Sequence, residues 1–200
     1  MAVLTGTVEA FASASVVQTL SVSAQPAVAM SRSSATSETA IINPENGTHN
    51  GLSASFSIQT NGTDENYNFI VGSKITSYGN VEVSAYSNDG NYLLFGRYGE
   101  EEYLPTADSI ENAKAGGKKN FNVIAYPIDS MVITSPMTVS YDDAFETAEG
   151  TGCYVVKVNG LQEGTLTQTL GGTPLSGTYS PSQDLAGQYR AVVYFTAISK

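Results

Sequence analysis

The chain has 200 residues, of which 41% are apolar and only 14% are charged, which is enough for one large domain with a real core. Its formal net charge of −10, from nine Lys and Arg against 19 Asp and Glu, argues against nucleic acid and acidic membranes as partners. The 19 Gly, with many Ser and Thr, are typical of an all-β protein rich in turns.

The beginning of the chain alternates in a way that predicts a strand. The segment Val3–Ser15 carries an apolar row of mostly small side chains on one face, and its other face is mainly polar. The row consists of Leu4, Gly6, Val8, Ala10, Ala12 and Ala14. Such a strand has little of its own to pack, so we expect it to need a groove from elsewhere. A second strand, Val17–Ala24, follows directly, because no Gly or Pro forms a hairpin between them.

The next part of the chain reads as a meander in which turn signals recur at regular intervals. A short strand, Ala27–Met30, and a brief edge segment, Ile41–Ile42, come first. The clearest alternation lies in Leu52–Ile58. Further strands are predicted at Tyr67–Ile75, Val81–Tyr86 and Tyr92–Tyr98. This spacing is typical of a sandwich or barrel.

The second half contains one candidate helix and several more strands. Thr106–Ala115 has a possible cap and a Gly-Gly stop. The later strands are predicted at Asn120–Tyr126, Met131–Thr134, Met137–Tyr141, Tyr154–Val158, Leu166–Leu170 and Gly187–Ser199. No repeat or linker divides the chain, so we expect a 1–15 extension and a single β-sandwich over 16–200.

A search for catalytic or metal-binding groups finds almost nothing. The one histidine, His49, lies in a Gly- and Asn-rich turn, and we expect it to be exposed to solvent. The one cysteine, Cys153, opens a strand-like run, so it is expected to be a small buried hydrophobe, with an intermolecular bridge as the alternative. No nucleophile motif or metal-ligand spacing occurs. The sequence therefore predicts no enzyme, no metal and no cofactor.

Acidic and aromatic residues leave some alternatives open. The clusters Glu100–Glu102 and Asp142–Asp143 are expected to be solvated surface rather than a glycosidase pair or a calcium site. The 12 tyrosines fit cross-strand pairs better than a sugar- or receptor-binding surface, which stays possible.

The two ends of the chain resemble the subunits of chaperone–usher pili. The small apolar row of the first strand is similar to the family's donor strand. The last strand is similar to the family's terminal strand, which follows a glycine fourteen residues from the end, as Gly187 does here. The family's penultimate tyrosine is replaced by Ser199. The absence of the pilin disulfide resembles the alternate (alpha) class.

This resemblance implies an immunoglobulin-like sandwich that lacks its last strand and is completed by the donor strand of a neighbouring subunit. Tyr189, Ala191, Val193 and Phe195, which follow Gly187, would line one side of the acceptor groove. The implied function is a structural subunit of a fimbrium that supports adhesion at the cell surface, reached through the periplasm. The implied partners are other copies of the chain, a periplasmic chaperone and an outer-membrane usher. A host-surface receptor is a further partner that the resemblance leaves open.

No membrane insertion is expected, because no run of about 18 apolar residues occurs. The alternative function is a self-contained secreted sandwich, a carbohydrate-binding or adhesin module, in which Val3–Ser15 pairs within its own domain. Whether the first strand pairs in cis or in trans is open at this point.

Overall fold

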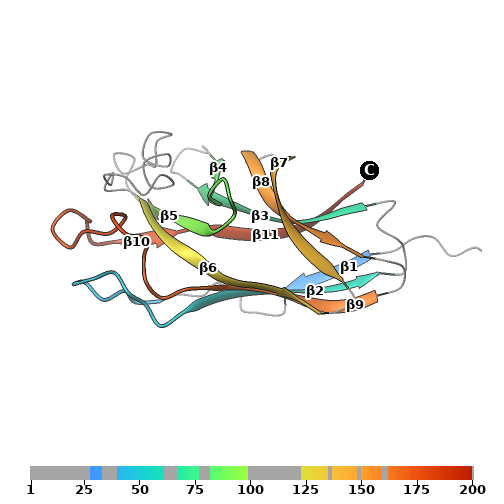
Figure 1. Cartoon of the computed structure of the whole chain (residues 1–200), viewed down its shortest axis with the longest axis horizontal. Coiled ribbons are helices and arrows are strands. Elements are labelled where there is room, and N and C mark those ends of the chain that lie inside the picture. Colours follow the sequence, from blue (N-terminus) through green and yellow to red (C-terminus); the bar gives the residue numbers. More distant parts are fainter. Residues whose placement is uncertain are drawn as a thin grey trace, which may run out of the picture.

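A computed structural model describes residues 28–32, 40–60, 67–76, 82–98, 123–134, 137–147, 150–158 and 162–199. This part of the chain contains strands and no helix, and the strands form two antiparallel sheets that pack face to face (Figure 1). The predicted all-β sandwich is therefore confirmed. The predicted strands Val3–Ser15 and Val17–Ala24 and the helix Thr106–Ala115 lie outside the described residues.

The first sheet has six strands in the order β1-β2-β9-β6-β5-β10, and the second has the order β11-β3-β8-β7 with the short β4 beside β3. The strands of the first sheet are β1 (Val28–Arg32), β2 (Leu52–Thr60), β9 (Gln162–Leu170), β6 (Val123–Ile133), β5 (Tyr92–Tyr98) and β10 (Gln188–Arg190). Those of the second are β11 (Val192–Ser199), β3 (Tyr67–Thr76), β8 (Gly150–Lys157), β7 (Thr138–Thr147) and β4 (Glu82–Ser84).

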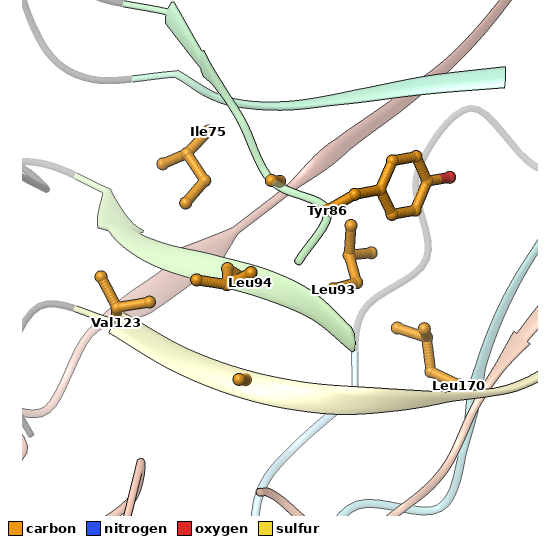
Figure 2. Packing of buried hydrophobic residues seen from close by; sticks show 8 residues of the cluster. Ile75, Tyr86, Leu93, Leu94, Val123 and Leu170 are labelled. Carbon is orange, nitrogen blue, oxygen red and sulfur yellow. The ribbon is translucent and has the colours of Figure 1, made fainter. Parts of the chain in front are cut away.

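The core lies between the sheets because apolar residues recur at every second position. In β2, Phe56 and Ile58 are buried, and Ser57 between them points to the other face. Two buried clusters fill the interior. The first contains Ile75, Ala85, Tyr86, Leu93, Leu94, Val123, Ala125 and Leu170 (Figure 2). The second contains Phe56, Ile58, Phe69, Val71, Met137, Val156, Val158 and Leu166.

Tyrosines join the first cluster to a turn at one edge of the sandwich. Tyr86 is 1% exposed, and its hydroxyl donates a 2.8 Å hydrogen bond to the Gln168 side chain. Its ring meets those of Tyr141 and Tyr154 edge to face. Tyr141 and Tyr154 are cross-strand partners, and their hydroxyls donate to backbone carbonyls of the 87–90 turn. The expected cross-strand use of tyrosine is confirmed for this pair.

Several predicted boundaries differ from the structure. The two strands expected in 120–134 are one strand, β6, which accommodates Pro127 and has a register shift between Ile128 and Ser130. The segment Ile41–Ile42 is not a strand, and Ile41 is 92% exposed. Asp142–Asp143 lies within β7 instead of a loop, because a bulge there lets charged residues remain at a sheet edge.

His49 is buried, with 8% of its surface exposed, so the expectation of an exposed loop histidine is wrong. Tertiary contacts explain the difference. The backbone N–H of His49 donates to the Gly172 carbonyl at 2.8 Å, and its ring lies edge-on to Tyr126 at 4.5 Å between centroids. Its Nδ1 accepts a 2.8 Å bond from the Gly51 N–H, so the neutral ring carries its proton on Nε2.

The expected burial of Cys153 is confirmed. The residue lies in β8 and has no exposed surface. Burial raises the pKa of its thiol to about 11, which keeps the thiol protonated and unreactive near neutral pH.

Truncating Leu94, which has no exposed surface in the first cluster, tests the described core. The Leu94→Ala change should lower the free energy of unfolding by about 2–5 kcal/mol, because it removes packing and leaves a cavity. Denaturant unfolding measures this loss. Ile41→Ala is the matched control, since removing an exposed side chain should change stability by no more than about 0.5 kcal/mol. Equal effects of the two variants would contradict the described core.

The buried His49 predicts a pH dependence of stability. Burial lowers the pKa of His49 below its ordinary value of 6.5, so the unfolded chain binds a proton at higher pH than the folded chain. The stability that this histidine contributes is complete above 6.5 and is lost as the pH falls from there through the lower folded-state pKa.

Denaturant unfolding at pH 7.5 and 5.5 measures this effect. We expect the free energy of unfolding to fall more between these two pH values for the native chain than for His49→Asn. Asn is a suitable control because its side-chain oxygen can also accept a hydrogen bond from the Gly51 N–H. The same loss in both chains would show that His49 does not carry this dependence.

Candidate functional site: the open edge of the second sheet

The C-terminal strand and Ala191, the residue just before it, place three of the predicted groove residues against the core. Ala191 contacts the first cluster, Val193 contacts both clusters and Phe195 contacts the second. Ala197, which the sequence analysis did not select, continues the same row. Every second residue of this strand therefore faces inward, as its alternation predicts.

Phe195 is the largest side chain in this row. Its ring stacks on Phe56 of β2 at 5.6 Å and on Phe69 of β3 at 6.4 Å between centroids. Phe195 thus joins the two sheets, because β2 belongs to the first and β3 to the second. Residues 192–197 of β11 are half-buried, although the β3 partners of Phe195 and Ala197, Val71 and Phe69, are at most 1% exposed. The core is consequently less well covered under β11 than under β3.

The remaining predicted groove residues, Gly187 and Tyr189, belong to a different part of the fold. Tyr189 lies on β10 and pairs with Arg97 in the first sheet. Its hydroxyl donates a 3.1 Å bond to the Leu185 carbonyl, and burial raises its pKa. Gly187 has φ +151°, and a Cβ there would lie 3.0 Å from the Arg97 side chain. Both residues precede Ala191, where the chain passes from β10 in the first sheet to β11 in the second.

The edges of the two sheets differ in how well they resist pairing with another strand. Edge strands in natural proteins are usually short, charged or bulged. The β7 edge carries Asp142, Asp143 and Glu146 and has a bulge, and β10 has only three residues. The β11 edge has eight residues, VVYFTAIS, without a charge, Pro or Gly. Among the described strands, β11 pairs with β3 alone, so it is the long edge with none of these protections.

A second edge lies next to β11. The five-residue strand β1 ends the first sheet and pairs with β2 among the described strands. Cα atoms of β1 and β11 come within 8 Å of each other, but the two strands are not paired. We call this pair of neighbouring edges, with the half-buried row of β11 behind it, the β1–β11 edge. Only the three-dimensional packing reveals the contribution of β1.

The predicted donor residues Leu4, Gly6, Val8, Ala10, Ala12 and Ala14 lie outside the described residues. Their position in the chain is still informative, because the segment that precedes β1 leads directly into one side of the β1–β11 edge. At roughly 3.3 Å per residue, an extended segment of that length is long enough to reach either its own edge or that of a neighbour.

Other kinds of site have less support in the described part of the chain. No three His, Cys, Asp or Glu side chains come together there in a way that could hold a metal ion. His49 has a buried Nε2 without a hydrogen-bond partner among the described residues, but its ring packs on Tyr126 as part of the folded interior. Within the described ranges, no helix is long and apolar enough to cross a membrane.

Comparisons with known proteins find no counterpart: no family model, curated protein or solved structure matches this chain. The β1–β11 edge is therefore interpreted from its own geometry and chemistry.

Proposed function

We propose that the chain is a structural subunit of a bacterial surface fimbrium and that it polymerises when the first strand of one copy pairs at the β1–β11 edge of the next. The observation that carries this proposal is the long, uncharged edge of β11 with its row of half-buried core residues. An edge of this kind is a template for strand addition.

The sheet topology restricts how a donor strand can enter. Neighbouring strands in the first sheet are antiparallel, so β1 and β10, at its two ends, run in opposite directions. The chain continues from β10 into β11 in the same direction (Figure 1), so β11 also runs opposite to β1. A strand between β1 and β11 is therefore antiparallel to one and parallel to the other. The antiparallel pairing is expected with β11, because it is the longer edge and antiparallel ladders are slightly more stable.

A donor strand can pair with both edges only if the two edges separate. A strand that pairs with both edges needs them roughly 10 Å apart, whereas Cα atoms of β1 and β11 come within 8 Å. The short β1 therefore has to move outward by at least about 2 Å at its nearest point to complete both ladders.

The energy available to such a contact is substantial. Pairing along the eight residues of β11 would form several main-chain hydrogen bonds, each contributing about 0.5–1.5 kcal/mol. Burial of the Leu4 and Val8 side chains adds roughly 1.5–3 kcal/mol each. The total is comparable with the whole stability of a typical domain, about 5–15 kcal/mol. Because this contact is head to tail and does not close on itself, it builds a filament.

The cellular setting is part of the same proposal. An uncovered edge of this kind promotes aggregation, so a periplasmic chaperone would cover it until an outer-membrane usher assembles the filament at the cell surface. A receptor on a host surface is the further partner that this setting implies.

The second candidate function is a self-contained secreted module that binds carbohydrate or a host surface. The observation that favours it is that β1 lies beside β11, because the segment that precedes β1 in the chain is then long enough to fold back along β11 of the same copy. Deletion of residues 1–15 separates the two functions. If the first strand pairs with a neighbouring copy, the shortened chain should fold as a monomer and make no filaments. If the first strand pairs within its own chain, the shortened chain should fail to fold.

The donor row predicts a sharp difference between neighbouring residues. Ala12→Arg would place an unpaired charge against the core, which costs several kcal/mol, so polymerisation should fall by about 100-fold or more. Ser13→Arg is the matched control, since it adds the same charge to the opposite face of the strand and should polymerise normally. Electron microscopy and denaturant-resistant ladders on gels measure both. Normal filaments from Ala12→Arg would refute the assigned row.

Strand complementation tests the acceptor directly. A synthetic peptide of residues 1–15 should bind the chain that lacks these residues and raise its melting temperature by several degrees, because a ligand of the folded state stabilises that state. The same peptide with Ala12→Arg should give no increase, and the Ser13→Arg peptide should act like the native one. If the native peptide gives no increase, the β1–β11 edge is not its acceptor.

A further inference from the structure

The loop between β1 and β2 contains two Asn–Gly pairs, Asn46–Gly47 and Asn50–Gly51. Both asparagine side chains are exposed. In such a pair the backbone nitrogen of the glycine can attack the carboxamide of the preceding asparagine, because glycine has no Cβ to obstruct the approach. The attack releases ammonia and converts the asparagine to an acid. The contacts of each glycine N–H therefore determine how readily each pair reacts.

The Gly51 N–H is hydrogen-bonded to a base. It donates to His49 Nδ1 at 2.8 Å, which is within the distance over which a side chain can take up a proton. The His49 ring packs on Tyr126, and this contact fixes the position of Nδ1. Burial lowers the pKa of His49, so the ring is neutral at neutral pH and its Nδ1 can accept the proton. A Cβ on Gly51 would meet nothing within 4 Å, so the space around this nitrogen is open.

The other pair has the same sequence but different contacts. The Gly47 N–H donates to the Asn43 carbonyl at 2.7 Å, and a carbonyl oxygen is far too weak a base to remove an amide proton. The Asn46 Oδ1 accepts from the Thr48 N–H at 3.1 Å and from the Thr48 hydroxyl at 2.8 Å, so this side chain is held in place. A Cβ on Gly47 would lie 2.6 Å from the Tyr179 ring. Asn46–Gly47 is therefore a natural internal control for Asn50–Gly51.

We propose that Asn50 is a site of self-catalysed deamidation, with His49 as the general base. The Gly51 nitrogen forms a bond to the Asn50 Cγ, and its proton passes to His49 Nδ1, in the way that an adjacent base activates a nucleophile. The bond between Cγ and the side-chain nitrogen then breaks, and the leaving nitrogen takes the proton back from His49 and departs as ammonia. A succinimide ring remains. Water opens this ring to aspartate or isoaspartate, so the reaction needs water and no other reactant.

The reaction adds a negative charge to the turn beside the buried His49. A nearby carboxylate favours the charged form of a histidine and raises its pKa, which opposes the effect of burial. Isoaspartate also lengthens the backbone between His49 and Gly51, so it disturbs the hydrogen bond between them. The inference depends on this turn alone and goes beyond the proposed filament.

Peptide mapping by mass spectrometry tests this proposal on the full chain. The folded protein is incubated at neutral pH, and deamidation at Asn50 and at Asn46 is followed with time. A parallel sample unfolded in guanidinium chloride gives the rate of each site without the folded turn. We expect Asn50 to react about tenfold faster than Asn46, or more, in the folded chain, and the two sites to react at similar rates in the unfolded chain.

His49→Asn isolates the role of the base. The asparagine oxygen can still accept from the Gly51 N–H but cannot take its proton, so deamidation at Asn50 should slow by about tenfold or more while Asn46 reacts as before.

The pH profile of the native chain gives a second measurement that needs no variant. The rate at Asn50 should change little between pH 7 and 8, where His49 is already neutral, whereas attack driven by hydroxide rises about tenfold over this range. Tyr126, the titratable side chain packed on His49, has a pKa raised by burial and stays neutral throughout. Equal rates at the two sites in the folded chain, an Asn50 rate unchanged by His49→Asn, or a tenfold rise with pH would each overturn the proposal.

Discussion

The incomplete cover over the core beneath the last strand is the constraint on which this structure depends. Phe195 bridges the two sheets through Phe56 and Phe69, yet residues 192–197 of β11 remain half-buried. Apolar surface and backbone groups at an edge both favour an additional strand. In the described part of the chain β11 pairs only with β3, so the proposed assembly depends on what occupies the other side of β11.

Other parts of the sandwich are better buried or better protected against pairing than the β11 edge. The first buried cluster is supported by Tyr86, Tyr141 and Tyr154, whose hydroxyl groups find partners while their rings pack together. At another edge, the bulge and acidic residues of β7 oppose pairing. The contrast between this edge and β11 is the physical reason for assigning an assembly role to β11.

The proposed contact between copies depends on the β1–β11 edge. This edge offers backbone pairing and apolar side chains, which favour one inserted strand in one register.

The sequence by itself determined the all-β class, most strand positions and the burial of Cys153, because strand alternation and turn residues are local signals. It also selected Val193 and Phe195, which lie on one alternating row. Only the tertiary structure decided that the last strand changes sheets at Ala191, that β1 lies beside β11, and that His49 is buried. These features depend on packing between segments far apart in the chain, and no local pattern of residues encodes such contacts.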